Sequence, residues 1–233
     1  MKFQSILALA PAIIASVSAA PTERATGPDP SKVTFDAIIY AGSGCPAGSV
    51  ANIANDDRTL LTTVFDSFIA SVGPGVAVTE NRKNCQMTLN IHYPGGFQFS
   101  IFEVDYRGYA QLDANVAGLQ KSTYYFSGST SQVSVLSSIL MFIGSKVNSS
   151  QATLQTPFKG PENGQDYTIT NKLEDSSLVW SPCGEEGLLN INAQVQVNTQ
   201  PGASSTAAGQ LTVDSVDTKV TQIYSVQWRP CTK

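Results

Sequence analysis

Hydrophobic and polar residues alternate along much of the chain, and the clearest example runs from Gln86 to Tyr93 (QMTLNIHY). Every second residue of this run is apolar, and the residues between them are polar. A period of two predicts a β-strand that buries one face and exposes the other. The sequence Pro-Gly-Gly at 94–96 ends the run and predicts a tight turn.

A second alternating run follows this turn, with apolar residues at Phe97, Phe99 and Ile101. If Tyr93 pairs with Phe97, the two runs form a hairpin whose apolar side chains share one face. Beyond Ile101 the phase slips by one residue, because the apolar positions there become even-numbered, beginning with Phe102. One slipped residue predicts a β-bulge at this point.

Further short runs of the same kind extend over Leu188–Val197, Gln210–Val213 and Thr221–Trp228. Segments rich in Gly, Pro, Asn and Asp separate them, as is typical of antiparallel strands joined by turns. The sequence therefore predicts an all-β fold, a two-sheet β-sandwich (jelly-roll-like) of about eight to twelve strands.

The first residues have the pattern of a secretory signal peptide. Lys2 precedes an apolar run that begins at Ile6 and ends in small residues at Val17-Ser18-Ala19. We expect cleavage after Ala19, so that 1–19 is a signal peptide, 20–31 a polar, Pro-rich flexible leader, and 32–233 one β-sandwich domain. The alternative interpretation of the apolar run is a buried N-terminal helix.

Charge is sparse along the chain: 14% of residues are charged and the formal net charge is −4. Without a cluster of Lys and Arg, the sequence argues against nucleic acid and membranes as partners. It carries no phosphate-binding loop and no dinucleotide fingerprint, and no cofactor is predicted.

Four cysteines are present, at Cys45, Cys85, Cys183 and Cys231. An even number in a secreted chain predicts two disulfides, for which the sequence allows three pairings. We favour Cys45–Cys85 and Cys183–Cys231, because each pair closes a loop within its own half of the chain. A zinc site is the alternative, but the chain has no C-x-x-C motif and a single histidine, His92, so no metal site is predicted.

The candidates for catalysis are Glu103, Asp105 and Arg107, which fall on one face of a predicted strand. Two neighbouring carboxylates can act as acid and base in glycoside hydrolysis. A stripe of charges on a solvated sheet face is the alternative interpretation. His92 would have to be the base of any Ser-His-Asp triad, but the sequence has no G-x-S-x-G motif to accompany it.

Several aromatic residues could stack on sugar rings, although Tyr and Trp are also ordinary core residues of β-sandwiches. Tyr106, Tyr109 and Trp180 are the candidates for ligand binding; the wider set adds Tyr124, Tyr125 and Trp228.

An ordered set of motifs resembles a known family of secreted proteins. The set comprises GSGCPAGSV (42–50), NRKNCQMTLNIHYPGGFQFSI (81–101), VDYRGYAQLD (104–113), YYFSG (124–128), GPENGQDYTI (160–169), VWSPCG (179–184), LNIN (189–192) and LTVDSVDTKVTQIYSVQW (211–228). Together these motifs resemble the family catalogued as domain of unknown function 4360, which is common in filamentous fungi. The resemblance implies a secreted, cysteine-linked β domain and implies no activity.

The segment 133–151 interrupts this resemblance with a mostly apolar run, VSVLSSILMFIGSKVNSSQ. If it is removed, Gln132 joins Ala152 and the sequence FSGSTSQ–ATLQTPFKGP fits the family pattern. The segment could be a translated intron, because Val-Ser can be encoded as a 5′ splice site and Gln as a 3′ splice site. Alternatively it is a genuine insert forming a surface loop or short helix, and Asn148 in the sequon Asn148-Ser149-Ser150 is then a glycosylation site.

These observations predict a secreted, non-enzymatic β-sandwich protein that binds at the cell wall or to glycan. A glycan-active hydrolase or lyase using Glu103, Asp105 and Arg107 is one alternative. A secreted inhibitor or effector-type interaction protein, with an extracellular protein as its partner, is the other.

Overall fold

The structure is a computed structural model that describes residues 27–127, 151–212 and 220–231. Its strands pair antiparallel throughout, in one continuous 11-stranded hydrogen-bonded sheet that folds into two layers. The strands are β1 (Thr34–Ala41), β2 (Val50–Ala54), β3 (Leu60–Phe65), β4 (Ala70–Val72), β5 (Arg82–Leu112), β6 (Val116–Phe126), β7 (Gln151–Lys159), β8 (Glu162–Lys172), β9 (Gly184–Thr199), β10 (Gly209–Thr212) and β11 (Val220–Pro230). Short 3-10 helices in the described ranges are η1 (Pro30–Lys32), η2 (Val78–Asn81) and η4 (Asp175–Ser177).

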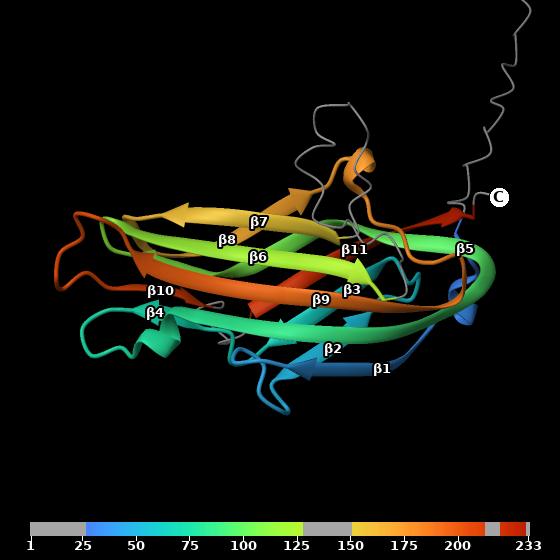
Figure 1. Ribbon diagram of the computed structural model, residues 1–233, viewed down its shortest axis with the longest axis horizontal. Helices are drawn as coiled ribbons and strands as arrows, with labels where there is room; N and C mark the ends of the chain where they lie inside the picture. The colour runs from blue at the N-terminus through green and yellow to red at the C-terminus, as the bar shows by residue number, and fades with distance from the viewer. Residues whose placement is uncertain (1–26, 128–150, 213–219, 232–233) are drawn as a thin grey trace, which may run out of the picture.

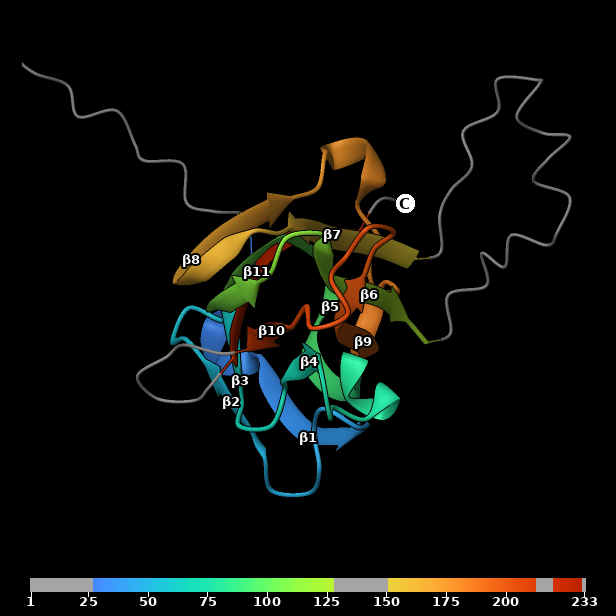
Figure 2. The same cartoon turned by 90° about the vertical axis from the view of Figure 1, so that its left-hand side faces the viewer.

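The long strand β5 belongs to both layers. Its first half, residues 82–92, lies between β1 and β9, and its second half, residues 97–112, lies between β11 and β8. One layer therefore has the strand order β1-β5-β9-β6-β7, and we call it the β9 layer. The other has the order β2-β3-β11-β5-β8, and we call it the β11 layer (Figure 1). Figure 2 shows the two layers edge-on, with β7 and β8 together at one edge.

The predicted hairpin between Tyr93 and Phe97 is wrong in its pairing. Residues 86–92 already pair with β1 on one edge and with β9 on the other, so the part of β5 that precedes the turn has no free edge for the second half. The turn at 94–96 instead carries the chain from one layer to the other, and Gly96 provides the left-handed backbone conformation there (φ 88°). The apolar faces of both halves still point inward, since Leu89 and Ile101 are fully buried.

The predicted bulge after Ile101 is confirmed. Ser225 of β11 faces Glu103, whereas the next residue, Val226, faces Ile101, so Phe102 is the extra residue on β5. The strands predicted from the alternating runs are also present, within β9, β10 and β11. The all-β, two-layer sandwich expected from the sequence is therefore the fold of the described residues.

Polar side chains join the layers through the core. Tyr106 of β5 donates a hydrogen bond to the carbonyl of Leu154 on β7 (3.2 Å), and Ser122 of β6 donates to Gln222 Oε1 on β11 (3.4 Å). Tyr106, Ser122 and Gln222 are fully buried. The sandwich core is thus built from large aromatic and aliphatic side chains with an enclosed set of hydroxyls and amides.

Two disulfides link the loops to this framework, in the pairing favoured from the sequence. Cys45, in the loop after β1, bonds to Cys85 of β5, and both are buried. Cys183, before β9, bonds to Cys231, after β11. Each bond joins segments that the strand pairing already brings together.

Several predictions fall outside the described residues. They are the signal peptide at 1–19, the first part of the leader, the segment 133–150 and the sequon at Asn148.

Candidate functional site

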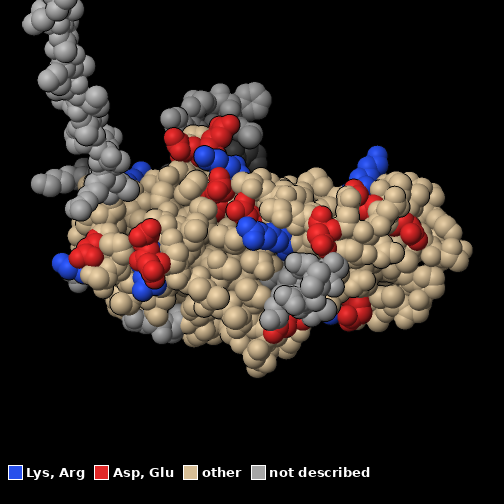
Figure 3. Space-filling view, turned by 180° about the vertical axis from the view of Figure 1, so that it is seen from behind, with Lys and Arg blue, Asp and Glu red and all other residues tan. Residues whose placement is uncertain are grey.

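The three charged candidates lie side by side on the outer face of the β11 layer. Glu103, Asp105 and Arg107 point outward, because the residues that alternate with them on β5 are fully buried. The Thr170 hydroxyl donates a hydrogen bond to Asp105 Oδ1, and no ion pair among the described residues joins the three. Figure 3 shows that acidic and basic side chains are interspersed over this side of the molecule. The geometry is that of a charged, solvated sheet face, and the hydrolase or lyase alternative stays a prediction.

Among the aromatic candidates, the prediction that Tyr106 binds a ligand is wrong. Its side chain has an exposed fraction of 0%, because it lies between the layers beneath β7, and it has no surface to offer a ligand. Tyr109 is half-buried, and its hydroxyl donates to Gln111 Oε1 (3.1 Å). Trp180 is also half-buried, and the Arg229 guanidinium lies 3.7 Å from the centre of its ring.

Tyr109 and Trp180 do not form a shared platform. Tyr109 is near the end of β5, opposite Thr212 of β10. Trp180 is next to Ser181, whose backbone N–H donates to the carbonyl of Phe99. Ten residues of extended strand separate Phe99 from Tyr109, which corresponds to about 33 Å. The structure therefore does not bring these two candidates together.

A set of side-chain amides covers the outer face of the β9 layer. On β9 the odd-numbered residues from Leu189 to Val197 point into the core, so the even-numbered residues point to the outer side. Of these, Asn192, Gln196 and Asn198 are partly exposed, whereas Asn190 and Gln194 are covered by neighbouring side chains. The neighbouring strands β5 and β6 alternate in the same way, and so does β7 beyond β6. We call the resulting set the amide face; it consists of Asn84, Gln86 and Asn90 of β5, Asn190, Asn192, Gln194, Gln196 and Asn198 of β9, and Gln151 and Gln155 of β7.

The strand register aligns these amides in rows across the layer. Asn192 lies between Gln86 of β5 and Thr123 of β6, and Gln194 lies between Asn84 and Lys121. Adjacent strands are about 4.8 Å apart, and alternate residues on one strand are about 7 Å apart. The amides of β5 and β9 therefore form adjacent rows of hydrogen-bonding groups, with threonine hydroxyls between some of them. β6 contributes no amide to the face, and its outward residues beside Gln196 and Asn198 are the apolar Leu119 and Ala117.

Hydrogen bonds within the face fix the orientation of its amides. Asn192 Nδ2 donates to Gln86 Oε1 (3.0 Å), and Gln194 Nε2 donates to Gln196 Oε1 (3.1 Å). Arg82 Nη2 donates to Gln194 Oε1 (3.0 Å). Each amide has two donor hydrogens and an acceptor oxygen, which is more than these contacts use. Asn192 and Gln196 are half-buried, so their remaining capacity is available at the surface.

Few ionisable side chains lie on this face. Arg82 and Lys121 are within the rows, and Lys159 is at the edge of the layer. His92 lies across from Glu186, with 4.0 Å between Nε2 and Oε1, at the end where β5 turns into the other layer. Because an ionic ligand is best recognised by opposite charge, this composition favours an uncharged polar ligand.

The same end of the face carries exposed apolar side chains. Tyr125 of β6 lies beside Asn190 and is 38% exposed, Leu188 is 40% exposed and Ile39 is 69% exposed. Tyr125 is the aromatic candidate that the structure places next to the amides. A tyrosine ring beside hydrogen-bonding groups is a surface on which a sugar ring can stack.

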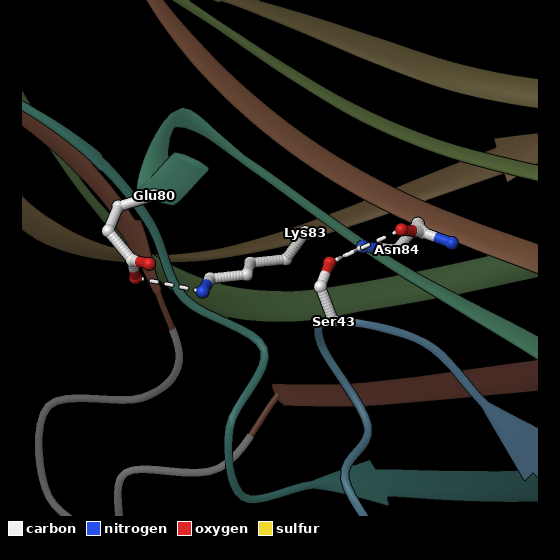
Figure 4. A network of polar contacts seen from close by, with 4 residues as sticks. All are labelled: Ser43, Glu80, Lys83 and Asn84. Carbon is white, nitrogen blue, oxygen red and sulfur yellow. Dashed lines mark hydrogen bonds and ion pairs between the residues drawn. The ribbon is translucent and has the colours of Figure 1, made fainter. Parts of the chain in front are cut away.

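The opposite end of the face opens into a hollow of about 480 Å³. The polar residues in its lining are Ser71, Asn81, Asn198, Thr199, Gln200, Ser204 and Ser205. Figure 4 shows how the adjacent elements are held: Glu80 of η2 forms an ion pair with Lys83 of β5 (2.8 Å), and the Ser43 hydroxyl donates to Asn84 Oδ1 (3.2 Å). The ion pair holds η2, one wall of the hollow, against the start of β5, and the Ser43–Asn84 hydrogen bond joins the loop after β1 to the same strand.

Sequence reasoning identified the strand that carries the amide face but not the face itself. In LNINAQVQVN (189–198), asparagine and glutamine occupy every outward position, and this regularity was the available signal. It is informative only once β5 and β6 are known to be the neighbours of β9, because one strand of amides could equally be an ordinary solvated edge.

Two further findings concern the described residues alone. They contain no helix with the length and hydrophobicity needed to cross a membrane. They also contain no group of three or more His, Cys, Asp or Glu side chains placed to hold a metal ion.

Fold and site together define a disulfide-linked, antiparallel β-sandwich with an amide-rich outer face that carries few charged side chains. The chain belongs to the family described as Domain of unknown function (DUF4360), which it matches over residues 31–231. This confirms the resemblance noted in the sequence. A relative from Arthroderma benhamiae (strain ATCC MYA-4681 / CBS 112371), described as "Uncharacterized secreted protein", is 46% identical over 205 residues, which cover 88% of this chain and 74% of the relative.

Solved structures show only distant similarity. TmCBM61, in complex with beta-1,4-galactotriose, is 9% identical, with 84% of this chain and 90% of that chain covered and a TM-score of 0.24. The enzymatically active domain of bacteriophage CBA120 tailspike protein 4 is 11% identical, with 87% and 20% covered and a TM-score of 0.21. At such TM-scores, nothing about the site or the function of this chain follows from either protein.

Proposed function

We propose that the protein is secreted and binds uncharged glycan through the amide face, without catalysing a reaction. The observation that carries the proposal is the set of aligned amides and hydroxyls on the adjacent strands β5 and β9, to which β6 adds Thr123 and β7 adds Gln151 and Gln155. Sugar hydroxyls both donate and accept hydrogen bonds, and so do side-chain amides and threonine hydroxyls. A flat polar face without a dominant charge matches a neutral polysaccharide chain.

The extracellular location has separate support. The two disulfides are typical of proteins that fold in an oxidising compartment. The relative from Arthroderma benhamiae is described as secreted. The pattern at 1–19 is that of a signal peptide.

Depletion from solution by insoluble neutral polysaccharides tests the glycan-binding proposal. Chitin, β-glucan, cellulose, xylan, mannan and galactan are each incubated with the mature protein, and the protein left in solution is measured. We expect at least one polymer to deplete the wild type. The triple variant Gln86→Ala, Asn192→Ala and Gln196→Ala should bind at least about tenfold more weakly, since each lost hydrogen bond contributes about 0.5–1.5 kcal/mol.

Gln165→Ala is the matched control, because it removes an exposed amide from β8, in the other layer. It should bind like the wild type. Equal depletion of the triple variant and the wild type would show that the amide face is not the binding surface. Sugar release from the bound polymer, lost in Asp105→Asn, would favour the hydrolase or lyase alternative.

A further inference from the structure

The hollow beside Asn198 is lined by amides, hydroxyls and apolar groups. Its volume is about 480 Å³, and none of the residues that line it carries an ionisable side chain. Amides and hydroxyls converge there with the apolar surfaces of Val72, Pro74 and Val76. A sugar ring has this same mixture of hydroxyl groups and apolar C–H faces, so the lining complements a single uncharged sugar residue.

The hollow is continuous with the amide face. Asn198 is the last outward amide of β9 and also lines the hollow. Asn81 of η2 donates a hydrogen bond to Asn198 Oδ1 (3.4 Å), so the two amides stand together at its edge. From Asn190 to Asn198 the outward positions of β9 extend over about 27 Å. A glycan chain lying along β9 would therefore reach the hollow without leaving hydrogen-bonding groups.

The wall beyond Asn198 is braced. The backbone N–H of Gln200 donates to the carbonyl of Asn115 (2.8 Å), and that of Ala203 donates to Gln200 (3.0 Å). The Asn115 side-chain amide donates to the carbonyl of Gly202 (3.1 Å). The chain from 200 to 207 is thus held as a turn that faces η2 across the hollow, and the strand face ends between them.

We propose that this hollow receives the terminal sugar of an uncharged glycan whose following residues lie on the amide face, so that the protein recognises chain ends. This inference rests on the proposed function and adds to it a class of ligand, the end of a neutral polysaccharide. Amides of Asn81, Asn198 and Gln200 bind the hydroxyls of the terminal residue. A glycan with a further sugar beyond the one in the hollow would collide with the turn at 200–207.

The test compares free and capped oligosaccharides of whichever polymer binds the wild type. Titration calorimetry measures the affinity of the uncapped oligosaccharide, of one with a bulky group on its reducing end, and of one with a bulky group on its non-reducing end. We expect one of the two caps to weaken binding about tenfold or more. The cap that does so identifies which end occupies the hollow.

Two variants test whether the loss of affinity caused by the cap arises in the hollow. Ala77→Trp places a large side chain at an exposed position in the lining, and Gln200→Ala removes one amide from it. In Ala77→Trp, the uncapped and capped oligosaccharides should bind alike, at the weakened affinity. Gln200→Ala should weaken the uncapped form and leave the sensitive capped form unchanged.

The outcomes separate this inference from the proposed function. If neither cap affects the wild type while the triple amide-face variant still loses binding, the hollow proposal is overturned and the glycan-binding proposal stands. If the wild type binds no neutral oligosaccharide, both are overturned.

Discussion

Three tyrosines in the core keep their phenol protons in the folded protein at pH values where an exposed tyrosine loses its proton. Tyr106, Tyr124 and Tyr224 are fully buried, and burial raises the pKa of each above its ordinary value. Each hydroxyl donates a hydrogen bond, to Leu154, Ile101 and Gln222 respectively. Both effects favour the neutral, protonated phenol in the folded state.

The sign of the pH dependence follows from these raised pKa values. Below the unfolded pKa of about 10, both states are protonated and the full stability is present. Above it, the unfolded state loses protons that the folded state keeps, so the free energy of unfolding falls by about 1.4 kcal/mol per pH unit for each such tyrosine. We expect urea unfolding measured between pH 9 and pH 11 to show this decline.

Tyr224→Phe is the control for this prediction, because it removes one of the three phenols. Its decline should be shallower than that of the wild type by the contribution of one tyrosine. A free energy of unfolding that stays constant from pH 9 to pH 11 would contradict the assignment of these tyrosines to the core.

At the scale of elements, local patterns predicted strands well and their partners poorly. The phase slip at Phe102 identified the bulge, because a bulge is a local change in the alternation. The turn at 94–96 did not reveal that β5 continues into the other layer, because a Pro-Gly-Gly sequence says nothing of which edges are already occupied. The buried position of Tyr106 and the alignment of the amide face depend on the same long-range pairing.

If the segment 133–151 is a translated intron, its removal must leave the pairing of β6 with β7 intact. Tyr124 lies opposite Ala152 and Tyr125 lies opposite Gln151. If 133–151 is removed, Gln132 precedes Ala152, and the same residue type again lies opposite Tyr125. The paired strands then keep their sequence and register, and residues 126–131 connect them.

We therefore expect a variant lacking 133–151 to fold with unchanged strand content and with a free energy of unfolding about 1 kcal/mol above that of the full chain, since each halving of a connecting loop lowers its closure cost by about 0.6 kcal/mol. Circular dichroism and urea unfolding measure both. Mass spectrometry of the secreted native protein decides which form exists. The peptide SQATLQTPFK is expected if the segment is an intron, whereas a peptide containing ILMFIGSK contradicts that hypothesis.

At the scale of the whole molecule, the two outer faces of the sandwich differ in the kind of polar side chain they present. The β11 layer presents Glu103, Asp105 and Arg107 among interspersed charges, whereas the β9 layer presents the amide face and leads into an uncharged hollow. Composition alone indicated few charges and many amides and hydroxyls, but it could not indicate that the amides gather on one side. Only the pairing of β9 with β5 and β6, distant in the sequence, produces that asymmetry.

Nuclear magnetic resonance tests most directly whether the amide face is the surface on which an uncharged glycan binds. Side-chain NH₂ resonances of asparagine and glutamine report on it directly, in a ¹⁵N-labelled protein titrated with the oligosaccharide that binds. If the amide face binds the glycan, the NH₂ signals of Gln86, Asn192 and Gln196 shift, whereas that of Gln165 on β8 and the backbone amides around Asp105 do not. Shifts confined to the outer face of the β11 layer, with the amide-face signals unmoved, would contradict this prediction.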